Sequence, residues 1–251
     1  MSYYAFKDPQ KKFSLSANEA SRLSRDIAYY CPYCDTARLY ICSRDGMKKP
    51  YFAANRANAR HSEECFYSNS QNHISLEQYS ESNFDFEGLC DSFLIPIKQV
   101  KKAKHNESKS NSSGTYSEKH IRTLRQLYLL CKSKSVQDTY NEQKIGYMLL
   151  DSRSLHMNPR GIFGNRVIET VLSKYFYNNE EKKLYFELKD NNKYKFIFEF
   201  FDETLYKNQR DTLYNNQDSI FVILGKWNKT TVFNQFISDF INQKQIWLLR
   251  K

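Results

Sequence analysis

Four residues near the start of the chain have the types and spacing of a metal site. Cys31 and Cys34 form a Cys-x2-Cys pair. After 26 intervening residues, His61 and Cys65 form a His-x3-Cys pair. Three thiolates and one imidazole suit a tetrahedral zinc ion and leave no coordination position open for a substrate. The sequence therefore predicts one structural Zn²⁺ site, with His73 as the alternative to His61. Free thiols spaced by chance or a redox Cys-x-x-Cys motif could give the same pattern, although no βαβ pattern surrounds the pair.

The elements around these residues must bring the two pairs together. Residues 38–43 alternate in the manner of a strand, and residues 50–53 follow as a second strand after a polar turn, so a hairpin is expected between the pairs. Residues 13–28 predict either a short helix capped near Ser16 or an irregular lead-in. A module of this size has little core of its own. The metal would therefore supply much of its folding free energy.

The same segment resembles a known family. Its Cys-Pro-Tyr-Cys, Arg-Leu-Tyr-Ile-Cys-Ser-Arg-Asp-Gly and Pro-Tyr-Phe-Ala-Ala runs, followed by His and Cys, resemble the N-terminal zinc-ribbon-like module of the competence-protein CoiA-like group. The likeness covers about 40 residues, and Tyr51 and Ala54 stand where that family often has His. The resemblance implies a zinc module in a DNA-processing or phage and mobile-element defence system. A nuclease-like domain follows in that family, but no such domain is recognisable here.

Length and charge suggest how the rest is organised. The chain has 251 residues and a formal net charge of +10, enough for one large domain or two small ones. Residues 101–134 carry nine Lys or Arg against two acids, whereas residues 68–100 carry one Lys against five acids. Residues 101–116 are polar and basic and predict a linker. We therefore expect a module with an acidic extension over residues 1–100, the linker, and a second domain over residues 117–251.

The second domain is expected to be mostly β-structure. The expected fold class is α+β, in which a small zinc-ribbon-like β module is followed by a β-rich, OB-like domain with two amphipathic helices. The first helix would begin after a Ser117 cap and bury Ile121 to Cys131 at helical spacing. The other expected elements are a second helix over residues 165–176, a hairpin of strands over residues 183–188 and 194–201, a strand over residues 219–224 ended by Gly225, a helix over residues 232–241, and a strand over residues 245–249.

Basic and aromatic residues indicate a nucleic-acid-binding protein without catalytic activity. Concentrated positive charge favours a polyanionic partner, because neutralising phosphates releases counterions. Aromatic side chains on exposed strands, with Tyr185 among them, can stack on the bases of a single strand. DNA is preferred over RNA as the partner. The candidate contacts are Lys101, Lys102, Lys104, Arg122, Arg125, Tyr194, Lys195, Lys226, Trp227 and Lys229.

Two other functions remain open from the sequence. A metal-dependent nuclease would use Glu187 and Lys189 as a Glu-x-Lys pair, with Asp151 or Glu169 as the upstream carboxylate. Alternatively, the chain would be an adaptor subunit whose zinc module docks a protein partner. A Gly-x-x-x-x-Gly-Lys phosphate loop is absent from the sequence, which argues against an autonomous ATPase.

The sequence also predicts where the protein resides. It has neither an apolar run long enough to cross a membrane nor the apolar core of a signal peptide at its start. Six cysteines without such a signal favour a reducing compartment over a disulfide framework. We therefore expect a cytoplasmic protein that has no membrane partner.

Overall fold

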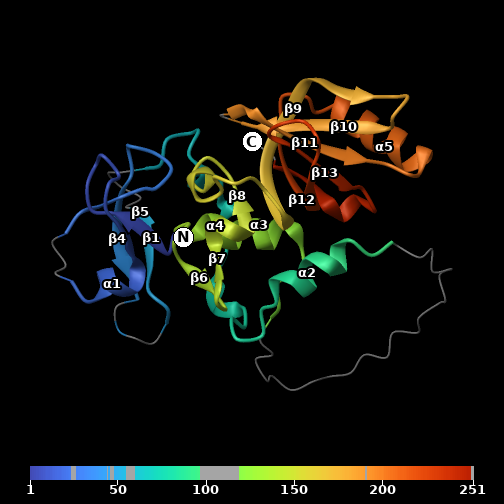
Figure 1. The fold of residues 1–251 in the computed structure, drawn as a ribbon. Helices are drawn as coiled ribbons and strands as arrows, with labels where there is room; N and C mark the ends of the chain where they lie inside the picture. The colour runs from blue at the N-terminus through green and yellow to red at the C-terminus, as the bar shows by residue number, and fades with distance from the viewer. Residues whose placement is uncertain are drawn as a thin grey trace.

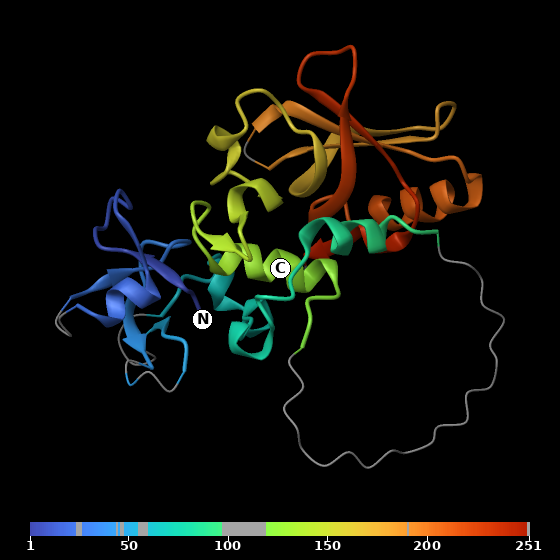
Figure 2. The same ribbon diagram turned by 60° about the horizontal axis from the view of Figure 1, so that its bottom comes forward.

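The fold has three parts that lie side by side: an N-terminal sheet, a central layer of short helices and a C-terminal barrel (Figures 1 and 2). The predicted linker, with Lys101, Lys102, Lys104 and the expected Ser117 cap, lies outside the described residues. The computed structural model describes residues 1–23, 27–43, 45, 48–54, 60–96, 119–189 and 191–249.

The strands and helices have the following bounds. The strands are β1 (Tyr4–Phe6), β2 (Ser14–Ser16), β3 (Tyr29–Tyr30), β4 (Arg38–Cys42), β5 (Tyr51–Ala54), β6 (Thr139–Tyr140), β7 (Gln143–Lys144), β8 (Leu149–Leu150), β9 (Gly164–Asn178), β10 (Lys183–Leu188), β11 (Asn191–Glu199), β12 (Ile220–Lys229), β13 (Gln235–Asp239) and β14 (Ile246–Leu249). The α-helices are α1 (Ala17–Ser21), α2 (Phe86–Phe93), α3 (Leu124–Ser133), α4 (Ile145–Met148) and α5 (Glu203–Tyr214).

The N-terminal part is a five-stranded antiparallel sheet in the order β2-β1-β3-β4-β5. The predicted hairpin is confirmed as β4 and β5, in which Ile41 is the partner of Phe52. The predicted short helix is α1, and its cap is Ser16. The Ser16 hydroxyl accepts a hydrogen bond from the Glu19 N–H at 3.2 Å, and the Glu19 carboxylate accepts one from the Ser16 N–H at 2.9 Å.

The central layer joins the N-terminal sheet to the barrel. The predicted helix after the linker is α3, which Thr123 caps by accepting a hydrogen bond from the Gln126 N–H. Leu127 and Tyr128 of this helix are fully buried, in one apolar cluster with Leu76 from the N-terminal part and Val222 on the outside of the barrel. Helix α2, in the acidic segment, buries Phe86, Cys90 and Phe93 in the same cluster.

The C-terminal part is a closed five-stranded barrel in the order β9-β10-β11-β13-β12, with β12 pairing back onto β9. β11 and β13 run parallel, whereas the other neighbours in the barrel are antiparallel. Helix α5 connects β11 to β12 and buries Tyr206 and Leu213 in the barrel core. β8 and β14 extend the sheet beyond the barrel, and aromatic side chains fill the interior, including Phe186, Phe196, Phe198, Phe221, Trp227 and Phe236.

Two predicted helices of this part are wrong, since both segments are strands. Residues 165–176 lie in β9, where Ile168 faces the barrel core and Val167 faces the central layer. Burial on both faces produces consecutive apolar residues, which imitate the pattern of a helix. Residues 232–241 contain β13, which is placed by pairing with β11 and β12. The α-helix of this part is α5, a polar segment that the sequence pattern did not reveal.

The remaining strand predictions are confirmed. β10 and β11 form the expected hairpin, and the last strand is β14. The strand expected to end at Gly225 instead continues to Lys229 as β12. The Ser238 side chain of β13 packs directly against Gly225. A Cβ added to Gly225 would lie only 2.6 Å from the Ser238 Oγ. Glycine here permits a close approach of side chain to backbone and does not end the strand.

Among the helices of the described residues, none combines the length and the apolar character needed to span a lipid bilayer.

Candidate functional site

The four predicted metal ligands come together at one end of the N-terminal sheet. Cys31 and Cys34 lie in the turn that joins β3 to β4. His61 and Cys65 follow the β4–β5 hairpin, and Cys65 immediately precedes the short 3-10 helix Phe66–Ser68. The ligand atoms of the four residues all lie within 4.8 Å of one another, and all six cysteines of the chain are free. These residues could therefore hold one metal ion.

Three of the six distances between the ligand atoms are close to those of a tetrahedral site, and the others do not exceed 4.8 Å. A Zn–S bond of about 2.3 Å and a Zn–N bond of about 2.0 Å require tetrahedral edges of about 3.8 Å between sulfurs and about 3.5 Å between sulfur and nitrogen. The Cys31 and Cys65 sulfurs are 3.8 Å apart. The His61 Nδ1 lies 3.6 Å from the Cys34 sulfur and 3.3 Å from the Cys65 sulfur. A closed N1S3 site is therefore compatible with the fold as it stands.

The surroundings of the cluster favour the thiolate form at Cys34 and Cys65, whereas the hydrogen bond with Cys65 and burial raise the pKa of Cys31. A hydrogen bond with the Cys31 thiol, together with one from His61, lowers the pKa of Cys65 to about 4. Burial opposes ionisation of Cys34, but hydrogen bonds from the Thr36 hydroxyl and from backbone N–H groups lower its pKa. These donors are typical of the outer shell of a metal–thiolate site, where they stabilise charge on sulfur.

Two aromatic residues beside the ligands connect the cluster to the central layer. Tyr33 lies between the first two cysteines, and Tyr67 lies two residues after the last one. Both phenols donate a hydrogen bond to the backbone carbonyl of Lys132 in α3. Two hydrogen bonds therefore connect the Cys/His cluster to α3, the helix that packs on the outside of the barrel.

The side chain of Lys132 continues this connection through a buried ionic network. Its ammonium lies 3.1 Å from Asp151 and 2.9 Å from Glu169 of β9. Arg153 donates to Asp151 at 2.8 Å, and the Tyr128 phenol donates to Glu169 at 2.6 Å. Burial of the carboxylate raises the pKa of Asp151, but Lys132 and Arg153 outweigh it and lower the pKa to about 2. Burial of the ammonium lowers the pKa of Lys132, but the two carboxylates outweigh it and raise the pKa.

This network determines where the carboxylates of the predicted nuclease lie. Asp151 is buried and Glu169 half-buried against Lys132, whereas Glu187 lines a hollow on the outside of the barrel and Lys189 is exposed. Within the described residues, Cys31, Cys34, His61 and Cys65 are the one group of three or more His, Cys, Asp or Glu residues close enough to share a metal ion. The two candidate upstream carboxylates, Asp151 and Glu169, are therefore held by ion pairs with Lys132.

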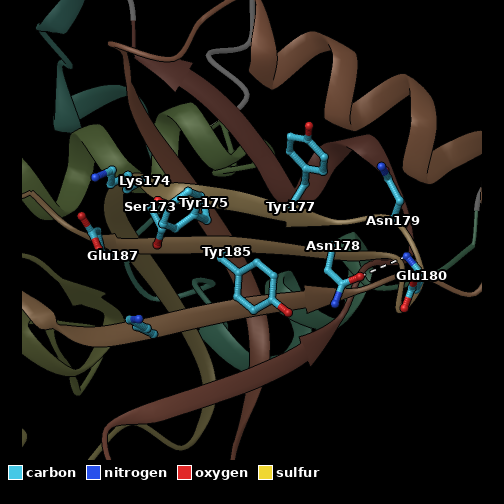
Figure 3. Close-up of a pocket in the computed structure, with 10 residues that line it drawn as sticks. Ser173, Lys174, Tyr175, Tyr177, Asn178, Asn179, Glu180, Tyr185 and Glu187 are labelled. Carbon is cyan, nitrogen blue, oxygen red and sulfur yellow. Dashed lines mark hydrogen bonds between the residues drawn. The ribbon is translucent and has the colours of Figure 1, made fainter.

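The hollow on the outside of β9, β10 and β11 has a volume of about 640 Å³. Figure 3 shows Tyr185 near its centre, Lys174 and Glu187 near one end, and Asn178 and Glu180 near the other. We call this surface the tyrosine face. It is lined by Ser173, Lys174, Tyr175, Tyr177, Asn178, Asn179, Glu180, Tyr185, Glu187 and Lys195.

A β-bulge gives the tyrosine face its shape. Leu184 of β10 pairs with Tyr177 of β9, but Phe186, two residues later, pairs with Leu172. Four residues of β9, from 173 to 176, therefore lie opposite Tyr185 alone. Such an insertion bends a strand and redirects its side chains. Tyr175 is 79% exposed as a result, and Lys174 beside it is also exposed.

The predicted nucleic-acid contacts are distributed over several surfaces. Lys195 lies on the tyrosine face, paired across the strands with Glu187. Tyr194 is half-buried and stacks on Phe236. Four further candidates are exposed but do not line the hollow: Arg122 and Arg125 near the start of α3, and Lys226 and Lys229 on β12.

The prediction that Trp227 lies exposed for stacking is wrong. The indole is fully buried in the barrel, with an edge-on contact to Phe196, and its Nε1–H donates to the carbonyl of Arg166 at 3.2 Å. Its neighbours Lys226 and Asn228 are exposed because alternate residues of a strand face opposite sides. Lys174, Tyr175 and Tyr177 of the tyrosine face were not predicted as contacts. Their signal was the alternation of the Lys-Tyr-Phe-Tyr run over residues 174–177, in which Phe176 is buried and its neighbours are exposed.

No family model, curated protein or solved structure matches this chain.

Proposed function

We propose that this protein binds single-stranded nucleic acid on the tyrosine face and that a structural zinc ion holds its N-terminal module together. The observation that carries the proposal is the hollow on the barrel exterior, where three tyrosines lie beside two lysines. Phenol rings stack on bases of any sequence, and lysines neutralise the phosphates between them.

The strand order of the barrel supports this choice of surface. In the order along the chain, its strands pair as 1-2-3-5-4-1, the third and fifth are parallel, and a helix links the third to the fourth. We take this as an OB-like arrangement. OB barrels bind oligonucleotides on the face of their second and third strands and on the loop between the first two. The corresponding parts here are β10, β11 and residues 179–182, which border the hollow.

The two lysines of the tyrosine face can contact phosphates, although Glu180 and Glu187 also line it. Lys174 and Lys195 are exposed there, and the chain as a whole carries a formal charge of +10. Each lysine that contacts a phosphate contributes to the slope of affinity against salt concentration, by about one for each contact. DNA is the proposed partner before RNA because of the resemblance of the N-terminal segment to a DNA-related family.

The metal of the N-terminal module is proposed to be zinc. Three cysteine sulfurs and one imidazole nitrogen within 4.8 Å of one another have the composition of a closed structural zinc site. The ion would supply stability and not catalysis, since its four ligands come from the protein. Through Tyr33 and Tyr67 it would fix the position of α3 against the barrel.

The direct test is fluorescence anisotropy of the full chain with labelled single-stranded DNA, single-stranded RNA and duplex DNA at several salt concentrations. Replacing Tyr175 or Tyr185 with Ala should weaken single-strand binding by about 5- to 100-fold, because stacking on an aromatic ring contributes about 1–3 kcal/mol per base. The matched control is Tyr147→Ala, which removes an exposed tyrosine of α4 outside the hollow and should leave affinity unchanged. Absence of binding to any single strand at low salt would refute the proposal.

A further inference from the structure

Glu187 is one of two acidic side chains in a hollow that also holds two lysines and three tyrosines. It is half-buried on β10, and its cross-strand partner is Lys195. Within the described part of the chain, its carboxylate makes no ion pair or hydrogen bond, although Lys174 and Lys195 line the same hollow. A carboxylate placed there repels phosphates and weakens general affinity, which is the usual effect of a group that discriminates between ligands.

The position of Glu187 suits contact with the edge of a base. Tyr185 lies two residues earlier on the same face of β10, and a strand rises about 6.7 Å over two residues. A base stacked on Tyr185 therefore has its hydrogen-bonding edge within reach of a carboxylate at that spacing. Figure 3 shows both side chains on the same side of the sheet, with Glu187 toward the Lys174 end of the hollow.

The chemistry of the carboxylate selects one base. An ionised carboxylate only accepts hydrogen bonds, and its two oxygens suit two neighbouring donors. The Watson–Crick edge of guanine presents such a pair, the N1–H and the 2-amino group. Adenine and cytosine present one amino group next to a ring nitrogen that repels a carboxylate, and thymine and uracil present one N–H between two carbonyls.

We propose that Glu187 reads guanine in the bound strand. This inference rests on the proposed function, and it adds a base preference to a surface that would otherwise bind any single strand. Tyr185 supplies the stacking platform, and Lys174 and Lys195 contact the phosphates on either side of the guanine.

The test uses the full chain and three labelled DNA oligomers in anisotropy titrations at one salt concentration. The oligomers are a thymidine decamer, the same decamer with one central guanine, and the same decamer with hypoxanthine in that place, which lacks the 2-amino group. We expect the guanine oligomer to bind about tenfold more tightly than the thymidine decamer, because a good two-hydrogen-bond contact to a base discriminates by about 1–3 kcal/mol. The hypoxanthine oligomer should lose most of that gain.

Two variants assign the preference to one carboxylate. Glu187→Gln should reduce the preference for guanine to below about threefold, which corresponds to losing most of the discrimination of a good base contact, and should leave binding to the thymidine decamer equal or tighter. Glu180→Gln is the matched control, because Glu180 is the other acidic residue that lines the hollow, at the turn between β9 and β10. It should keep the full preference.

The outcomes separate this inference from the proposed function. Equal binding of all three oligomers by the unmodified chain would overturn the role of Glu187 while single-strand binding stands. Loss of the preference in Glu180→Gln but not in Glu187→Gln would also overturn it. If none of the oligomers bound, the proposed function itself would fall.

Discussion

Replacing Lys132 with Met should destabilise the protein far more than breaking an ion pair on the surface. The ammonium of Lys132 lies 3.1 Å from Asp151 and 2.9 Å from Glu169, whose side chains are 1% and 13% exposed. Met fills most of the same volume but removes the positive charge that these two carboxylates share. Removing one partner of a buried ion pair costs about 3–5 kcal/mol, because the remaining charge is uncompensated.

The contacts that remain place the expected loss toward the lower end of that range. Asp151 keeps its pair with Arg153 at 2.8 Å, and Glu169 keeps the hydrogen bond from the Tyr128 phenol at 2.6 Å. The backbone carbonyl of Lys132 still accepts its hydrogen bonds from Tyr33 and Tyr67, since only the side chain changes. We therefore expect a loss of about 3 kcal/mol in the free energy of unfolding.

The assay is urea unfolding of the metal-bound protein, followed by circular dichroism and by tryptophan fluorescence. The matched control is Lys207→Met on α5, where the ammonium lies 2.7 Å from Glu203 but the two side chains are 57% and 59% exposed. That pair should contribute far less to stability, because water and salt screen its charges. Equal losses in the two variants would refute the reasoning that burial decides the cost. If Lys132→Met does not fold, Glu169→Gln is the second test, and it should cost more than the Lys207 variant.

Three further predictions concern the ionic network, the metal cluster and the barrel core. The lowered pKa of Asp151, about 2, stabilises the fold above the ordinary carboxyl pKa near 4, so about 2 kcal/mol should be lost as the pH falls from about 4 to about 2, and Asp151→Asn should remove that part of the acid dependence measured by equilibrium unfolding. Cys34→Ser should abolish one bound zinc per chain, measured by elemental analysis, and lower the melting temperature, whereas Cys42→Ser should keep the metal because Cys42 is outside the cluster. Trp227→Ala should cost about 3–5 kcal/mol of stability by leaving a cavity, whereas Trp227→Phe should keep single-strand affinity, because the indole is buried and does not reach the tyrosine face.

The metal cluster could be predicted from the sequence because its signal is local. Two closely spaced ligand pairs and an alternating hairpin between them limit the possible geometry. In the structure the ligand atoms of those four residues lie within 4.8 Å of one another. The same holds for the Ser16 cap of α1 and for the β10–β11 hairpin, where a few neighbouring residues decide the conformation.

The barrel and its tyrosine face depended on contacts between distant parts of the chain. Residues 165–176 have a helix-like pattern, and they become a strand because β10 and β12 pair with them on both sides and the central layer covers their outer face. Tertiary pairing of this kind overrides local preference. The bulge that exposes Tyr175 exists only in that pairing, and the burial of Trp227 follows from which side of β12 closes the barrel. The sequence therefore determined which residues could bind a metal, and the tertiary structure decided which aromatic residues reach solvent, because the side of a sheet that faces the core is set by its partners.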